Sequence, residues 1–217
     1  MITYFQYGEK EIEHLKRADK RLAAVIDHVG MIERPVIPDL FAALVHSIVG
    51  QQISTKAHKT IWERIQKGLG EITPVVIDGL PLEKLQQFGI TFKKAAYIKS
   101  VAQKILTHEF DINSLHSMSD KEVSAKLSEL DGIGTWTAEM LMIFSMQRPN
   151  ILSYGDLAIL RGLRMLYHHR KVDKAKFNKY WKRYTPYAST ASLYLWAVAG
   201  GAIDGMKDYA PKKSKYE

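Results

Sequence analysis

Apolar residues recur every three or four positions along almost the whole chain, which is the spacing of one face of an α-helix. The repeat starts near the N-terminus and continues through the next two apolar stretches, with these members: Ile12, Leu15, Leu22, Val25, Ile26, Val29; Leu40, Ala43, Leu44, Ser47, Ile48; Ile61, Ile65 and Leu69. We therefore expect an all-α fold.

The same periodicity predicts seven helices downstream, over residues 81–87, 93–106, 120–130, 135–146, 157–168, 174–184 and 187–199. The short segments between them carry Gly, Pro, Asn and Asp, which are the residues that turns require. One apolar run, 74–77, reads equally well as a short strand or as a turn of helix.

A tight hairpin is predicted where one amphipathic stretch ends and the next begins, in the sequence LDGIGTWTAEM (130–140). Gly132 can take the left-handed conformation that reverses the chain after a helix. Gly134 leaves the first amides of the next helix uncovered, and a helix N-terminus attracts phosphate. Thr135 and Thr137 add hydroxyl donors. The hairpin is suited to hold a nucleic-acid backbone without reading bases, although a plain connection between helices has the same spacing.

Composition agrees with a nucleic-acid partner and excludes several other classes. The 31 Lys and Arg residues exceed the 23 Asp and Glu residues, giving a net charge of +8, which favours a polyanion. The absence of cysteine excludes disulfides, thiolate zinc sites and iron–sulfur clusters with cysteine ligands. No apolar run approaches the length of a membrane span, and the N-terminus lacks a secretory pattern. We expect a cytoplasmic protein, associated with the nucleoid if bacterial.

Four motifs, in this order, resemble the helix-hairpin-helix DNA glycosylase superfamily: SIVGQQISTKAHKTIWERI (47–65), LSELDGIGTWTAEMLMIFS (127–145), RPNILSYGDLAILRGLRMLY (148–167) and YTPYASTASLYLWAVAGG (184–201). The resemblance covers about residues 38–201 and is strongest to the branch of 3-methyladenine DNA glycosylase II. It implies base excision from double-stranded DNA that contains alkylated bases, by a monomer that flips the base out of the duplex.

The resemblance also implies two helical lobes around a DNA-binding cleft. Residues 38–146 would form the central lobe, with the helix-hairpin-helix at about 120–146, and residues 1–37 and 147–217 would form the other, in which an N-terminal helix joins the C-terminal helices. No cofactor is expected. The resemblance allows a structural sodium or potassium ion on the carbonyls of Ser128, Leu130 and Ile133.

Asp156 stands at the position of the superfamily's catalytic aspartate. Breaking an N-glycosidic bond builds positive charge on the sugar, and a fixed carboxylate stabilises that charge and activates the attacking water. Asp156 also precedes a helical run and is a natural N-cap. A cap with no catalytic role is the alternative, and the two roles are compatible.

Trp136 lies where relatives that also cut the strand carry a lysine, whose amine forms a Schiff base with the sugar. The sequence therefore predicts a monofunctional glycosylase. By position, Trp136 and Trp196 match pocket aromatics that hold a cationic base by cation–π attraction, and Met140 and Leu157 would complete the wall. Each tryptophan is equally compatible with a place in the core. The damage spectrum stays open.

Gln52 lies where relatives present a wedge that fills the gap left by the flipped base. For Gln51 we favour a structural role, as a residue that caps or cross-links helices. Three positions depart from the family pattern: Asp131 replaces the hairpin proline, Asn150 and Ser153 replace an aspartate and a proline before Asp156, and Ala188 replaces an arginine. A helix-hairpin-helix module that binds DNA without catalysis is the alternative function, and an all-α protein-interaction domain is a third.

Overall fold

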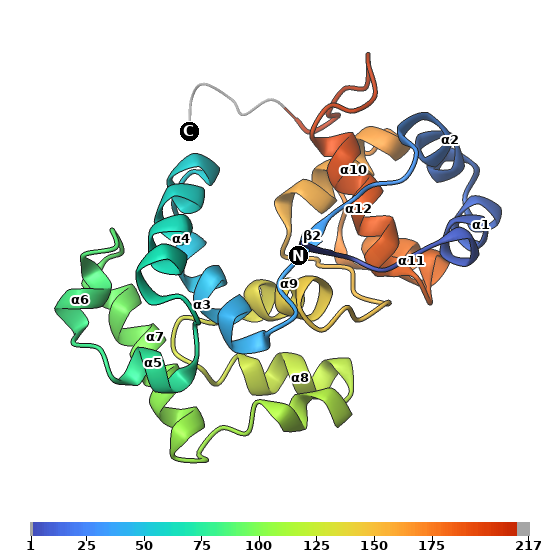
Figure 1. The fold of residues 1–217 in the computed structure, drawn as a ribbon. Helices are drawn as coiled ribbons and strands as arrows, with labels where there is room; N and C mark the ends of the chain where they lie inside the picture. The colour runs from blue at the N-terminus through green and yellow to red at the C-terminus, as the bar shows by residue number, and fades with distance from the viewer. Residues whose placement is uncertain (1, 212–217) are drawn as a thin grey trace. The chain divides into compact units, whose positions relative to one another are not determined.

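The computed structural model describes residues 2–211, and almost all of their regular structure is helical, which confirms the all-α prediction (Figure 1). The helices are α1 (Glu9–Ala18), α2 (Lys20–Val29), α3 (Leu40–Gly50), α4 (Thr55–Leu69), α5 (Pro74–Asp78), α6 (Leu82–Gln86), α7 (Phe92–Leu106), α8 (Asp120–Leu127), α9 (Thr135–Phe144), α10 (Leu157–Tyr167), α11 (Lys174–Tyr184) and α12 (Ala188–Ala199), with the 3₁₀ helix η1 (Asn113–Ser117). Two short strands, β1 (Thr3–Tyr4) and β2 (Pro35–Val36), pair with each other.

The N-terminal apolar repeat forms two helices rather than the single helix we expected. The break falls at Asp19, whose extended backbone ends α1 and starts α2. Its side chain accepts hydrogen bonds from the amides of Arg21 and Leu22 and so caps α2. The run 74–77, left open between strand and helix, is helical in α5, which Thr73 caps.

The chain divides into two compact units. Unit 1 is mainly Val36–Met146, where we expected a lobe of residues 38–146. Unit 2 combines Tyr4–Pro35 with the chain from Gln147 onward. Unit 1 contains α3 to α9. Helix α3 packs against α4, α7 and α9, while α5 and α6 pack on α7, and α8 packs on α9. Its fully buried side chains include Leu44, Ile48, Ile98, Leu127 and Ile143.

Unit 2 contains α1, α2, α10, α11 and α12, and α10 packs against α12. The packing is closest at Gly162, where a Cβ atom would lie 2.4 Å from the carbonyl oxygen of Leu195. Only glycine allows that approach, so the two helix backbones are in direct contact. The core around them includes Leu15, Leu22, Leu163, Tyr184 and Tyr194.

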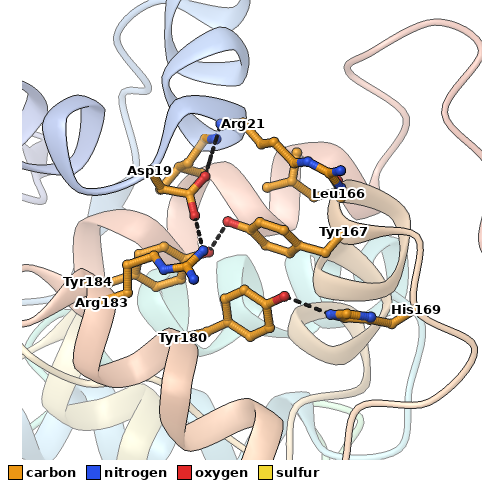
Figure 2. A network of polar contacts seen from close by, with 9 residues as sticks. Asp19, Arg21, Leu166, Tyr167, His169, Tyr180, Arg183 and Tyr184 are labelled. Atoms are coloured by element: carbon orange, nitrogen blue, oxygen red, sulfur yellow. Dashed lines mark hydrogen bonds and ion pairs between the residues drawn. The ribbon is translucent and has the colours of Figure 1, made fainter.

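A network of polar and aromatic side chains ties α2 to α10 and α11 inside unit 2 (Figure 2). Arg183 donates to the buried Asp19, and the hydroxyls of Tyr167 and Tyr184 hydrogen-bond at 2.6 Å. Burial alone would raise the pKa of Asp19, but the hydrogen bonds from the Leu22 amide and from Arg183 outweigh it and hold that pKa below its ordinary value. The carboxylate therefore stays charged at neutral pH.

Across residues 2–211, none of the helices combines the length and the apolar character that crossing a bilayer requires.

Candidate active site and DNA-binding hairpin

The hairpin predicted from LDGIGTWTAEM joins α8 to α9 within unit 1. Gly132 has a φ of +81°, and a Cβ there would lie 2.5 Å from the ring of Tyr97. Conformation and packing thus both require glycine at this position. Leu130 and Ile133 are buried on either side and anchor the turn.

Gly134 is the N-cap of α9, and a Cβ there would meet no atom within 4 Å. The N-cap residue places no side chain over the start of α9 and makes no side-chain hydrogen bond to its amides, as a phosphate-binding helix end requires. Thr135 is exposed beside them. Thr137 is only 6% exposed, so the expectation that its hydroxyl donates to DNA is not supported. Two residues after Thr135, the helix has turned this side chain toward the core together with Ala138.

The loop that carries Gln52 is fastened to the hairpin by its neighbour. Gln51 Nε2 donates to the carbonyl of Gly132 at 2.7 Å, as the favoured structural role for this residue requires. Gln52 is exposed and has a φ of +55°, a left-handed conformation uncommon for a residue with a side chain. Such backbone strain is often found where a side chain is held for a function.

Lys94 on α7 is a positioning residue that sequence reasoning missed. Its Nζ donates to the carbonyl of Val49 at 2.8 Å and to that of Gln51 at 2.6 Å, both at the C-terminal end of α3. Burial lowers the pKa of this amine. A single lysine in an amphipathic helix gives no signal of such a bond, since it reads like any solvated lysine.

Trp136 and Met140 lie one turn apart on α9. The Trp136 side chain is 47% exposed, which argues against a place in the core of unit 1. Met140 is half-buried. The two side chains therefore provide an apolar surface next to the hairpin amides, within the same unit.

Asp156 caps α10 in unit 2. Its Oδ1 accepts hydrogen bonds from the amides of Ala158 at 2.8 Å and Ile159 at 2.9 Å, and the residue is 7% exposed. The cap and the buried setting hold the carboxylate in one position at the N-terminus of α10. Leu157, which follows it, is 80% exposed.

The segment before Asp156 is held by Ser189, a second residue that sequence reasoning missed. The Ser189 hydroxyl is fully buried, donates to the carbonyl of Arg148 at 2.5 Å and accepts from the amide of Ile151 at 2.9 Å. Its neighbour Ala188, one of the departures, is fully buried in the core and leaves no space for an arginine.

Trp196 lies on α12 and is half-buried, packed against the core of unit 2. It belongs to that unit together with Asp156 and Leu157, whereas Gln52, the hairpin glycines, Trp136 and Met140 belong to unit 1. Of the remaining departures, Asp131 accepts a hydrogen bond from the hydroxyl of Ser100, so part of its charge is turned toward α7. Ser153 is buried.

For a cation at the hairpin, main-chain oxygens are the available ligands, because residues 2–211 contain no cluster of three or more His, Asp or Glu side chains placed to hold a metal. The carbonyl of Leu130 accepts from the amide of Ile133 at 3.0 Å and keeps a second lone pair. Carbonyl oxygens suit a hard cation, and a sodium or potassium ion on Ser128, Leu130 and Ile133 stays a prediction.

The helical fold, the two-glycine hairpin and the capped aspartate beyond it define a class of repair protein. The chain belongs to the HhH-GPD superfamily of base excision DNA repair proteins, whose sequence model matches residues 45–186.

The relatives sharpen this assignment. DNA-3-methyladenine glycosylase 1 of Schizosaccharomyces pombe is 27% identical over 218 residues, which cover 98% of this chain and 95% of the relative. The crystal structure of a DNA-3-methyladenine glycosidase from Bacillus halodurans superimposes with a TM-score of 0.78 at 35% identity, covering 91% of this chain and 93% of that one. A Schizosaccharomyces pombe 3-methyladenine DNA glycosylase in complex with abasic DNA gives 0.74 at 26% identity, covering 94% and 100%. Both the family and the branch inferred from the motifs are confirmed.

Proposed function

We propose that this chain is a monofunctional DNA glycosylase that removes alkylated purines such as 3-methyladenine from double-stranded DNA. It acts as a monomer, in the cytoplasm or on the nucleoid. The observation that carries the proposal is the carboxylate of Asp156, which is buried and fixed by two backbone amides at the start of α10. The names of the relatives support the choice of substrate.

The chemistry needs only this one charged group. As the bond between the sugar and the base nitrogen breaks, its electron pair leaves with the base, and positive charge develops on the sugar. An ionised carboxylate stabilises that charge and takes a proton from the water that adds to the sugar. Alkylation weakens the bond beforehand, because a cationic purine is a better leaving group. The products are the free base and an abasic site.

The side chain at position 136 supports hydrolysis without strand cleavage. Lyase chemistry at this position requires an amine that forms a Schiff base with the sugar, and an indole cannot supply one. The half-exposed ring of Trp136 offers instead an electron-rich face to a cationic base. An 8-oxoguanine glycosylase/lyase from Clostridium acetobutylicum shares the fold at only 21% identity, and at that identity the likeness indicates the fold alone.

The test is release of free base from methylated duplex DNA under single-turnover conditions, with the Asp156→Asn variant as comparison. Asparagine is also a good N-cap, so the variant should fold and keep its affinity for damaged DNA while excision falls by on the order of 10²–10³-fold, the usual effect of removing one charge-stabilising group. Abasic DNA should accumulate uncut, and borohydride should trap no covalent adduct.

Two outcomes would contradict the proposal. Equal excision by the variant and the natural chain would remove Asp156 from catalysis. Binding of methylated DNA without any base release would favour a non-catalytic helix-hairpin-helix protein.

A further inference from the structure

The net positive charge of this protein is concentrated in one segment of the chain. Residues 157–203 hold nine Lys or Arg residues and one acidic residue, Asp173, a net charge of +8. The rest of the chain holds 22 basic and 22 acidic residues and is neutral. The whole net charge of the molecule thus lies in a stretch of unit 2 that follows Asp156, outside the hairpin.

Three of the nine basic residues lie within ion-pair distance of two carboxylates of unit 2. Arg164 makes two hydrogen bonds to Asp208, at 2.7 and 2.6 Å, and Arg161 lies 4.0 Å from the same carboxylate. Arg183 pairs with the buried Asp19. The other six are exposed, and none of them has an ion pair with an acidic side chain in residues 2–211: Arg170, Lys171, Lys174, Lys176, Lys179 and Lys182.

Helix α11 places its lysines away from the core. Phe177, Tyr180 and Tyr184 are buried, and Tyr180 and Tyr184 point into the network of Figure 2. At 100° per residue, Lys179 and Lys182 lie opposite this buried stripe, with Lys176 flanking it on the adjacent side. We call the exposed side chains of Lys176, Lys179 and Lys182 the lysine face.

No acidic side chain offsets the lysine face from within its own helix. The nearest acidic residue along the chain, Asp173, caps α11 and accepts from the amide of Lys176 at 2.8 Å. That backbone hydrogen bond is the first cause of a lowered pKa for Asp173, and the charge of Lys176 lowers it further, so Asp173 partly offsets Lys176. Lys179 and Lys182 are not among the causes of that shift. A surface with several unpaired charges of one sign costs stability through self-repulsion, so it indicates a partner of opposite charge.

We propose that the lysine face is a second DNA-binding surface, which contacts the phosphate backbone of the duplex independently of the hairpin. The choice of DNA as the partner rests on the proposed function. Lysine is a compact charge on a flexible stem, which suits phosphates and reads no base. Protein interfaces instead favour arginine and aromatic residues and contain less lysine than other surfaces, so an acidic protein fits this face less well.

The experiment compares Lys176→Gln/Lys179→Gln/Lys182→Gln with a control, Lys20→Gln/Lys67→Gln/Lys84→Gln, which removes the same charge from exposed lysines outside both the lysine face and the hairpin. Binding to an undamaged duplex is measured by fluorescence anisotropy at several salt concentrations. Each lost phosphate contact reduces the slope of log K against log salt by about 0.9, so the lysine-face variant should lose roughly 2–3 units of slope. Its affinity at low salt should fall by about tenfold or more. The control should keep both, and thermal melting should show both variants folded.

Unchanged binding by the lysine-face variant, or an equal loss in the control, overturns the proposal. If the substitutions instead abolish binding to polyglutamate and spare DNA, the surface belongs to an acidic protein partner. Because the probe contains no damaged base, the binding result is independent of catalysis. If the natural chain releases no base but the lysine-face variant loses DNA binding, the second DNA-binding surface is supported and the proposed glycosylase activity is contradicted.

Discussion

In the proposed function, Trp136 occupies the position that separates hydrolysis from strand cleavage, and its exposure makes that role testable without loss of the fold. We predict that Trp136→Ala weakens excision of cationic 3-methyladenine by up to about 2 kcal/mol, or roughly 30-fold, the upper value for a desolvated cation–π contact. Stability should change little, because the ring is 47% exposed. Single-turnover excision measures the effect, and a neutral base such as hypoxanthine should show a smaller one. Lost stability with unchanged excision would place the ring in the core.

The residues to which the proposed function assigns the chemistry can be predicted from the sequence, while the residues that hold them in place cannot. Asp156 and Trp136 stand out because an aspartate before a helix and an aromatic ring at a lysine position each have a chemical meaning. Lys94 and Ser189 have no such meaning until the fold brings them to carbonyls more than forty positions away in the chain. Long-range contacts of ordinary polar residues have no local pattern, so no reading of one sequence finds them.

At the scale of helices, the contact between α10 and α12 depends on Gly162, which has a hydrogen atom where alanine has a methyl group. Gly162→Ala puts a Cβ 2.4 Å from the carbonyl oxygen of Leu195, a clash with backbone that cannot rotate away. We predict a loss of about 2–3 kcal/mol in the free energy of unfolding, the usual cost of overpacking a core. Chemical denaturation measures it. Gly134→Ala is the matched control, since its Cβ meets nothing within 4 Å, and it should lose no more than about 1 kcal/mol, because alanine is a poorer N-cap than glycine.

The loop that carries Gln52 should loosen when its clamp is removed. Lys94→Met keeps the length of the side chain but removes two hydrogen bonds to carbonyls, and we predict a loss of about 2 kcal/mol in stability. DNA affinity should fall as well, because the loop no longer holds one position. Lys84→Met, at an exposed position of α6, should change neither quantity. A destabilised Lys94→Met protein with full DNA affinity would show that the clamp serves the fold alone.

Apart from the start of α2 after Asp19, helix starts were predictable because caps are local, and helix ends were less so. Helix α11 covers Lys174–Tyr184, as predicted, after the cap Asp173. Helix α8 was expected to reach residue 130 but ends at Leu127. The apolar repeat continues through Leu130, which is buried although the backbone has already left the helix. Burial rather than helical geometry sets that part of the pattern.

At the scale of the molecule, stability should fall in acid. The pKa values of Asp19, Asp173 and Asp208 all lie below their ordinary value, and for Asp208 the hydrogen bonds from Arg164 are the main cause. Below the unfolded-state pKa of about 4, the unfolded chain binds these protons first, so the free energy of unfolding decreases as pH falls through the folded-state values. Above that pH the contribution is complete.

The variant Asp208→Asn isolates one part of this acid dependence. At neutral pH it should be less stable than the natural chain by about 1–2 kcal/mol, because the ion pair is lost and one of the two hydrogen bonds from Arg164 loses its acceptor. The difference should shrink on acidification, as the natural carboxylate takes up its proton. Urea denaturation at a series of pH values measures both proteins. A difference that is the same in acid and at neutral pH would show that the Asp208 charge contributes nothing.

The cross-link from Gln51 to Gly132 also bears on how quickly such a protein could inspect DNA. Lys94 holds the same loop. The side chain of Gln52, which would enter the duplex, and the hairpin, which would hold the strand, are therefore fixed to each other before DNA binds. Neither the loop nor the hairpin would have to move into place after the protein meets DNA. Inspection of each site would then be limited by the deformability of the DNA, so mismatched or weakened pairs would be sampled sooner than sound ones.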